Sequence, residues 1–262
     1  MTGKTEPGHS TPGRIERLAE RLVAADPLLG PWREALERRL RRAAELEARL
    51  TEGRMRLADF ASGHEYFGLH RRGGEWVLRE WAPNATRVSL VGEMTDWKER
   101  TNFALERLDG ADGVWEIRLP ASAMAHGDLY RLRVHWIGGQ GDRIPAWARR
   151  VVQDPQTLIF NAQVWDPPSS YRWRREGFCC AVQTPFVYEA HVGMAQEEER
   201  IGTYREFTEK VLPRVVRAGY DVLQLMAIQE HPYYGSFGYQ VSSFFAASSR
   251  FGTPEDLKAL ID

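Results

Sequence analysis

The 262-residue sequence predicts a multidomain protein with a helical amino-terminal segment, an all-β sandwich, and a unit in which strands and helices alternate. Three observations predict these classes. Leucines recur at helical spacing within residues 31–53. From about Tyr66, short β-rich runs alternate with Gly, Asp, Asn and Pro. Residues 182–262 then follow the order strand, helix, strand, long loop, helix, which is typical of a parallel sheet.

The unit boundaries are predicted where the composition changes. Residues 1–56 form the helical segment, 57–166 the β-sandwich, 167–181 a linker, and 182–262 the alternating unit. The linker follows a stretch rich in Pro, Ser and Arg, which is typical of the exit from a domain. The length of the chain, larger than one usual domain, agrees with several units.

The charge balance favours a neutral partner. Lys plus Arg (35) nearly equal Asp plus Glu (36), which removes the electrostatic argument for nucleic acid or an anionic membrane. The two cysteines, Cys179 and Cys180, are adjacent, and adjacent cysteines rarely bridge each other. The opening lacks the apolar core of a signal peptide, and no run of 18 apolar residues occurs. We therefore expect a cytoplasmic protein without disulfides.

Two helices are predicted in the amino-terminal segment. Thr11 is the expected cap of the first and Pro12 its first residue. Its apolar face comprises Ile15, Leu18 and Leu22. The second covers residues 31–53, and arginines crowd the surface outside its leucine stripe. We interpret these arginines as a solvated face paired with the interleaved glutamates, in preference to a binding patch.

The predicted sandwich is unusually rich in tryptophan. Eight of the nine tryptophans lie between Trp76 and Trp173. A sandwich of about a hundred residues cannot bury all of them. An exposed indole offers a flat face on which a ligand ring can stack.

The alternating unit carries clear helix signals. Thr203 and Glu206 form a capping box for a helix over residues 203–220, and Pro213 should bend that helix or divide it. Thr253, Pro254 and Asp256 begin the last helix in the same way. The apolar run 221–229 is predicted to be a buried strand beside the strand at 184–193.

The loop after residues 221–229 is the candidate site of this unit, because working residues of α/β barrels lie at the carboxyl ends of strands. It carries Glu230, His231, Tyr233, Tyr234, Phe237, Tyr239 and Gln240. Packing of the tyrosines against the loop, and a satisfied buried histidine at His231, are the structural alternatives to ligand contact.

No catalytic pattern is recognisable from the residues themselves. A nucleophile elbow, paired-cysteine metal spacing, HExxH and a phosphate-binding glycine loop are all missing from the sequence, so neither a metal nor a cofactor is expected. Retaining glycosyl transfer needs two carboxylates roughly 5 to 5.5 Å apart. Glu189 and Glu230 fall on strands predicted to be adjacent, but no motif marks them as such a pair.

Long stretches nevertheless resemble a known family. The run "VYEAHVGMAQEEERIGTYREFTEKVLPRVVRAGYDVLQLMAIQEHPYYGSFGYQVSSFFAASSRFGTPEDLKALID" resembles the start of the catalytic barrel of glycogen and starch branching enzymes, within glycoside hydrolase family 13. Upstream, "GHEYFGLHRRGGEWVLREWAPNATRVSLVGEMTDW" and "RIPAWARRVVQDP" resemble a carbohydrate-binding module of family 48. "DPLLGPWREALERRLRR" is similar to the helical amino-terminal segment of the eukaryotic-type enzymes.

This resemblance implies a fold and a partner. The fold would be an immunoglobulin-like sandwich followed by the truncated start of a (β/α)8 TIM barrel, and the partner an α-1,4-glucan such as glycogen, amylose or starch. The implied reaction cleaves an α-1,4 linkage, holds the severed chain as a covalent glycosyl-enzyme and transfers it to a 6-hydroxyl as an α-1,6 branch. The family's nucleophilic aspartate and acid/base glutamate lie on later strands, beyond Asp262. We therefore expect an amino-terminal fragment without the catalytic carboxylates and inactive by itself.

The resemblance also implies binding residues. Tyr239 of "FGYQ" matches the tyrosine that stacks on the sugar at the cleavage point, Gln240 stands beside it, and His231 matches a position near the same pocket. In the sandwich, the positions associated with glucan contact are Trp81, Ala82, Pro83, Trp97 and Arg133. The family's usual "GDFNGW" is here "GEMTDW", which keeps Gly92 and Trp97 but changes the residues between them.

Two other functions stay open on the sequence. A stand-alone α-glucan-binding protein would need no catalytic strands. A fragment of a debranching-type family 13 enzyme would carry the same module, although "MAIQEHPYYGSFGYQ" favours branching.

Overall fold

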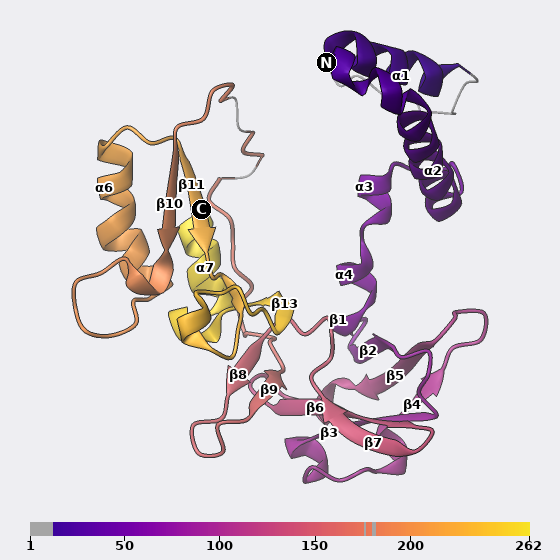
Figure 1. Cartoon of the computed structure of the whole chain (residues 1–262). Helices are drawn as coiled ribbons and strands as arrows, with labels where there is room; N and C mark the ends of the chain where they lie inside the picture. Colours follow the sequence, from indigo (N-terminus) through magenta and orange to yellow (C-terminus); the bar gives the residue numbers. More distant parts are fainter. Residues whose placement is uncertain (1–12, 176, 180–181) are drawn as a thin grey trace. The chain divides into compact units, whose positions relative to one another are not determined.

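The computed structural model describes residues 13–175, 177–179 and 182–262 (Figure 1). The chain divides into two compact units, Met1–Glu65 and Tyr66–Asp262, which are described separately. The predicted helix start at Thr11 and Pro12, and Cys180, lie outside the described residues. Within the described part, no helix is both long and apolar enough to cross a membrane.

The first unit is helical, as predicted. Helix α1 spans Arg14–Ala25, a 3-10 turn spans Pro27–Trp32, and α2 spans Arg33–Thr51. Two short helices follow, α3 (Leu57–Phe60) and α4 (Gly63–Tyr66).

Three of the six arginines of α2 contact glutamates in the described part of the chain. Arg33 contacts Glu37 at 3.0 Å, one turn along the helix, and Arg41 contacts Glu16 of α1 at 3.5 Å. These exposed pairs each contribute little free energy, but they agree with a solvated charged face. Leu18 and Leu22, two of the three residues predicted for the apolar face of the first helix, are exposed.

The second unit begins with a curled antiparallel sheet. Its strands are hydrogen-bonded in the order β1-β2-β5-β4-β3-β6-β9-β8, and β7 pairs with β6 outside this path. The strands are β1 (Gly68–Arg72), β2 (Glu75–Trp81), β3 (Arg87–Gly92), β4 (Ala104–Arg107), β5 (Val114–Pro120), β6 (Leu129–Trp136), β7 (Gly139–Arg143), β8 (Val151–Gln153) and β9 (Phe160–Gln163). Strand β4 joins the two halves of the sheet because it pairs with β5 on one side and with β3 on the other.

The alternation predicted for these strands is realised in β6. Tyr130, Leu132 and Val134 point into the core, whereas Arg131 and Arg133 lie on the opposite, partly exposed face. The core that these side chains enter is one cluster of buried apolar residues from both halves of the sheet. Its burial is the main source of stability of this part.

The end of the chain contains a parallel strand pair. Strand β10 (Val187–His191) pairs in parallel with β11 (Val222–Met226). Between them the predicted capping box forms: Thr203 Oγ1 accepts from the backbone N–H of Glu206, and the Glu206 carboxylate accepts from the N–H of Thr203.

The helix after this cap is divided, as Pro213 predicts. One turn of α-helix, α5 (Tyr204–Glu206), passes into a π-helical stretch at Phe207–Val211, and α6 (Leu212–Arg217) follows. Proline lacks the N–H of a regular turn, so the ladder is rearranged immediately before it.

A second strand pair follows β11. Strand β12 (Gln229–Glu230) pairs antiparallel with β13 (Ser243–Ala247), and helix α7 (Pro254–Ile261) closes the chain with its predicted Thr253–Asp256 capping box. The predicted neighbourhood of Glu189 and Glu230 is therefore wrong. Glu189 lies exposed on β10, whereas Glu230 belongs to β12, which pairs with β13 and not with β10.

The antiparallel sheet and the β10–α7 region contact each other within the second unit. The Trp147 ring stacks on Phe245 with centroids 4.1 Å apart. Arg150 donates to the carbonyl of Gly252 at 2.6 Å, and Trp165 Nε1 donates to the Glu255 carboxylate at 2.9 Å. These contacts combine ring stacking with partly buried hydrogen bonds.

Candidate functional site

Trp81, the last residue of β2, has the most exposed aromatic ring among the strand-end residues of the antiparallel sheet. Its side chain is 56% exposed, although the residues before it are buried. The indole Nε1 donates to the backbone carbonyl of Asp112 at 3.0 Å. This bond satisfies the polar edge of the ring and holds it in one orientation while its face stays accessible.

The loop that receives this bond encloses a hollow of its own. An open hollow of about 440 Å³ is lined by Arg107, Leu108, Asp109, Gly110, Ala111, Asp112 and Gly113. It offers carboxylates, a guanidinium and backbone groups, which are the partners that sugar hydroxyls use.

Ala82 and Pro83 fasten this loop to the strand end. The N–H of Ala82 donates to the carbonyl of Gly113 at 2.8 Å, and the Ala82 carbonyl accepts from Trp115 Nε1 at 3.0 Å. Gly113 has φ +74°, and a Cβ there would lie 2.5 Å from the Cα of Pro83. Only glycine fits this position. Ala82 itself is buried, so its part is to position the neighbouring residues.

The buried carboxylate of Glu80 binds backbone groups at the end of β2. Glu80 accepts from the N–H of Trp81 at 3.1 Å and from the N–H of Ala146 at 2.9 Å. Burial raises the pKa of Glu80, and these backbone bonds oppose that rise. Arg143 lies 3.8 Å from Glu80 and donates to the Trp81 carbonyl at 3.3 Å. The backbone at Trp81 is thus held through its N–H by Glu80 and through its carbonyl by Arg143.

Trp97 lies on a different turn of the same sheet. It is 36% exposed, has φ +58°, and its N–H donates to the carbonyl of Gly92 at 2.9 Å. A Cβ at Gly92 would lie 2.3 Å from the carbonyl oxygen of Leu129. The "GEMTDW" turn therefore keeps its glycine for a steric reason, and Trp97 follows it in a left-handed conformation.

Arg133 forms a bidentate ion pair with Asp142. Its Nε and Nη2 donate to the two carboxylate oxygens of Asp142 at 2.7 and 2.8 Å. These bonds lower the pKa of Asp142. Arg131, on the same face of β6, donates from Nη2 to the carbonyl of Phe160. It pairs with Val91, one register position from Gly92, so it lies nearer to the Trp97 turn than Arg133 does.

The aromatic loop of the last region separates its predicted residues. Tyr239 is 80% exposed and Gln240 is also exposed. His231 is fully buried, with Nδ1 2.9 Å from the carbonyl of Gln229. A Cβ at Gly238 would lie 2.4 Å from the Cα of Ala227, and its φ is +83°, so glycine is required to turn the chain before Tyr239.

His231 belongs to a buried polar group. His191 lies near it on β10, and burial followed by the proximity of His231 lowers the pKa of His191. Glu230 is fully buried, accepts from the N–H of Ser249 at 2.6 Å, and its backbone carbonyl accepts from the N–H of Ser242 at 2.9 Å. The two ends of the aromatic loop are therefore fixed at Glu230, while its tip with Tyr239 is open.

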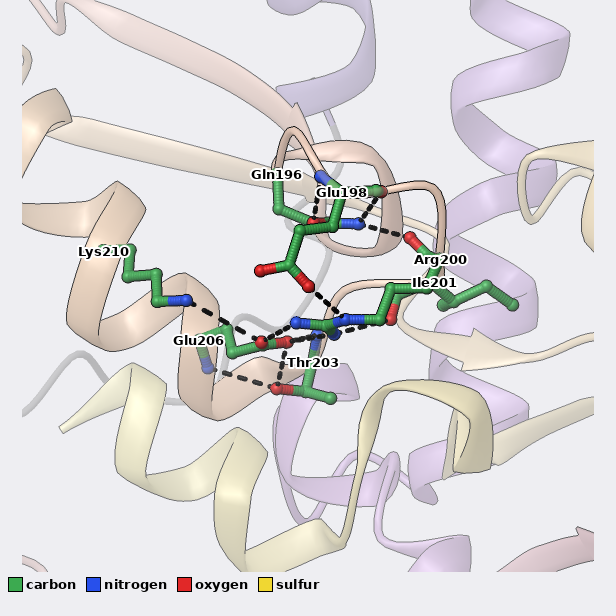
Figure 2. A network of polar contacts seen from close by, with 7 residues as sticks. All are labelled: Gln196, Glu198, Arg200, Ile201, Thr203, Glu206 and Lys210. Atoms are coloured by element: carbon green, nitrogen blue, oxygen red, sulfur yellow. Dashed lines mark hydrogen bonds and ion pairs between the residues drawn. The ribbon is translucent and has the colours of Figure 1, made fainter.

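A dense charged network lies on the loop after β10 (Figure 2). Arg200 Nε donates to Glu198 at 2.7 Å, and its Nη1 donates to Glu206 at 3.0 Å. The hydrogen bonds from Arg200 and from the Thr203 hydroxyl lower the pKa of Glu206 to about 2. The carboxylates of Glu198 and Glu206 already accept hydrogen bonds from Arg200 and from the capping box. The network therefore orders this loop, and these two carboxylates do not form a free pair.

The comparisons with known proteins agree with this arrangement. Residues 66–155 match the family carbohydrate-binding module 48 (isoamylase N-terminal domain). These residues include Trp81, Trp97 and Arg133. The loop 107–113 also falls within them.

Curated relatives are named 1,4-alpha-glucan-branching enzymes. The chain is 41% identical to that of Rhizophagus irregularis over 247 residues, covering 90% of this chain and 35% of the relative. It is 42% identical to that of Yarrowia lipolytica over 251 residues, with the same two coverages. For Solanum tuberosum the identity is 39% over 249 residues, covering 92% of this chain and 29% of the relative.

Solved structures share the fold at low identity. The pullulanase from Bacillus acidopullulyticus superposes with a TM-score of 0.57 at 18% identity, covering 74% of this chain and 27% of that one. The GBS pullulanase SAP, solved in complex with maltotetraose, gives 0.57 at 18% identity, covering 73% and 29%. The chain thus spans about a third of the length of the curated relatives it matches. Over about 90% of its own length it is similar to part of the 1,4-alpha-glucan-branching enzymes, and its residues 66–155 match carbohydrate-binding module 48.

Proposed function

We propose that this chain is the α-glucan-binding, amino-terminal portion of a 1,4-alpha-glucan-branching enzyme, and that Trp81 is its principal sugar platform. The observation that carries the proposal is the Trp81 ring, which is 56% exposed and is held through its Nε1 by the carbonyl of Asp112, a residue that lines the hollow of loop 107–113. An indole face suits the C–H-rich face of a glucose ring. Arg107, Asp109 and Asp112 supply partners for its hydroxyls.

The remaining predicted residues take supporting parts in this proposal. Pro83, half-buried, packs against Gly113 and so supports the loop, and Trp97 offers a second, smaller aromatic surface. Arg133 has both ends of its guanidinium fork bound to Asp142, so sugar contact there would have to use its remaining donors.

The last region is proposed to be the start of the (β/α)8 barrel, after an immunoglobulin-like sandwich at 57–166 and a linker at 167–181. The parallel pair β10–β11 with its intervening helix supports this, because a barrel is built from such units. Tyr239 and Gln240 would then form one wall of a sugar subsite at the carboxyl ends of the strands. The buried His231 would position that wall and would not touch the sugar.

Glucan binding by the 262-residue chain tests this proposal. In a native gel that contains glycogen, the wild-type chain should migrate more slowly than in a plain gel, and Trp81→Ala should remove most of the retardation. Trp173→Ala is the matched control, because Trp173 is also a half-exposed indole but lies in the linker. Equal retardation of the wild type and Trp81→Ala would refute the role given to Trp81.

A further inference from the structure

Arg150 reaches from the antiparallel sheet into the β10–α7 region. It precedes strand β8, is only 8% exposed, and its Nη1 donates to the carbonyl of Gly252 at 2.6 Å. Its guanidinium also lies over the Trp165 ring, 5.2 Å from the centroid. A buried guanidinium with these partners is held in one place, so the carbonyl that it binds is held as well.

Glu230 binds the same part of the chain at a second point. This part is the 3-10 turn Ser249–Phe251, which Gly252 follows directly. The fully buried Glu230 carboxylate accepts from the N–H of Ser249 at 2.6 Å. Among the hydrogen bonds of the described residues none joins Arg150 to Glu230 directly, but each of them holds one end of the turn.

The two side chains also balance each other's charge. Burial lowers the pKa of Arg150, and the negative charge of Glu230 is the largest of the effects that oppose this. A buried charge is costly by itself, and an opposite charge nearby offsets part of the cost. Removal of either group would leave the other as a less compensated buried charge.

The turn is tied to the base of the aromatic loop, residues 231–242. Arg250, inside the turn, donates from Nη2 to the carbonyl of Pro232 at 2.5 Å. The backbone carbonyl of Glu230 accepts from the N–H of Ser242 at 2.9 Å and from its hydroxyl at 3.2 Å. The two ends of the loop therefore meet at Glu230, and their position depends on the turn.

Backbone pairing alone gives this base little support. Strand β12 has only two residues, and its register with β13 shifts between Gln229 and Glu230. Tyr239 is 80% exposed, so its own packing does not hold it. The place of its ring therefore depends on what holds the base of the loop.

We propose that Arg150 and Glu230 are positioning residues for Tyr239, because they clamp the turn at 249–252 from both ends and so fix the base of the loop that carries this ring. The inference rests on the proposed sugar subsite at Tyr239. It adds to that subsite a residue of the antiparallel sheet, Arg150, that does not touch the sugar. The sheet would thus contribute to the geometry of a site that lies outside it.

Hydrogen exchange of the 262-residue chain, followed by mass spectrometry on peptides of the loop and of strands β2 and β5, tests this clamp. Arg150→Met should speed exchange of the amides at 231–242 about tenfold, because the loss of a hydrogen bond from a charged group favours local opening. Arg150→Lys keeps the charge that faces Glu230 and should restore part of the protection.

The carboxylate is tested with a matched pair of variants. Glu230→Gln keeps an acceptor for the N–H of Ser249 but removes the charge, so it should speed exchange of the loop by a smaller factor than Arg150→Met. Glu189→Gln, at an exposed glutamate of β10, is the control and should exchange like the wild type.

A general loss of stability would give a different pattern, because it speeds exchange most in the best protected strand amides. Unchanged loop exchange in folded Arg150→Met overturns the clamp. Acceleration in β2 and β5 that equals or exceeds that in the loop overturns it too.

A measurement on the wild type covers the case in which Arg150→Met does not fold. The amides of Ser242 and Ser249, which both bind Glu230, should exchange as slowly as the hydrogen-bonded amides of strand β8, because the clamp makes them open together. Much faster exchange at Ser242 and Ser249 than in β8 overturns the proposal.

Maltoheptaose separates the clamp from the proposed function. At saturation it should slow exchange of residues 231–242 in the wild type. If it does not, while Arg150→Met still loosens the loop, the sugar subsite has failed and the clamp stands. If it does, while Arg150→Met leaves the loop unchanged, the clamp has failed and the subsite stands.

Discussion

The indole nitrogen of Trp81 donates to the backbone carbonyl of Asp112 at 3.0 Å, across 31 residues of sequence. This bond joins the end of one strand to the loop that precedes another, and it turns an exposed ring into an oriented surface. The orientation depends on the close approach of Pro83 and Gly113 behind it. The first prediction tests that approach.

Gly113→Ala should both destabilise the chain and weaken glucan binding. The φ of +74° is unfavourable for alanine, and the new Cβ would lie 2.5 Å from the Pro83 Cα, so we expect a loss of about 2–4 kcal/mol in unfolding free energy. Gly110→Ala is the matched control. It has the same φ but no atom within 4 Å of the added Cβ, and should cost only about 1 kcal/mol. Equal losses in urea unfolding would contradict the steric argument.

Arg150→Met should loosen the contact between the antiparallel sheet and the β10–α7 region. Arg150 is buried, donates to the Gly252 carbonyl at 2.6 Å and carries the charge that faces Glu230. Loss of a hydrogen bond from a charged group in such a place costs about 2–3 kcal/mol. Thermal unfolding should report the change, whereas Arg172→Met, at an exposed position, should leave the midpoint unaltered. If Arg150→Met unfolds at the same midpoint as the wild type, this hydrogen bond does not contribute to stability.

Stability should fall as the pH drops below 6.5. Burial and the nearby His231 lower the pKa of His191 from its ordinary value of 6.5, so the unfolded chain binds the proton more readily than the folded one. The loss begins near pH 6.5 and grows until the pH reaches the lower folded pKa. The lowered pKa of the buried His70 acts in the same direction.

The variant His191→Gln should reduce this slope in urea unfolding measured between pH 7.5 and 5.5. His64→Gln, at an exposed histidine, is the control and should keep the wild-type slope. If His191→Gln keeps the full slope, His191 is not the group responsible.

The 262-residue chain should not form α-1,6 linkages from amylose. Retaining transfer needs two carboxylates across the scissile bond, and the pair considered from the sequence does not provide them: Glu189 is exposed on β10, and Glu230 is buried on β12 and bonded to Ser249. Incubation with linear amylose, followed by debranching and chain-length analysis, should give an unchanged profile. Short chains released only after debranching would contradict this.

Local signals in the sequence predicted local structure well. The Thr203–Glu206 and Thr253–Asp256 capping boxes, the strand alternation of β6 and the break at Pro213 all depend on residues within a few positions of one another. Such features are set by backbone hydrogen bonding and side-chain periodicity, which a single sequence records directly.

Features that depend on register between distant segments were not predictable in this way. The separation of Glu230 from β10 and the contact of Trp81 with Asp112 depend on which strands pair and on where a loop folds back. The contact of the Trp136 indole with Gly139 likewise needs the β6–β7 register. The sequence "HWIGGQGDR" indicates a hairpin, but not the face on which its indole lies.

The affinity of the chain for maltoheptaose, measured by calorimetric titration for the wild type and for Trp81→Ala, tests the role of the oriented ring most directly. We predict that the wild-type chain binds and that Trp81→Ala binds about tenfold more weakly, with an unchanged unfolding midpoint. Equal affinity of the two folded proteins would contradict the assignment of Trp81 as the principal sugar platform.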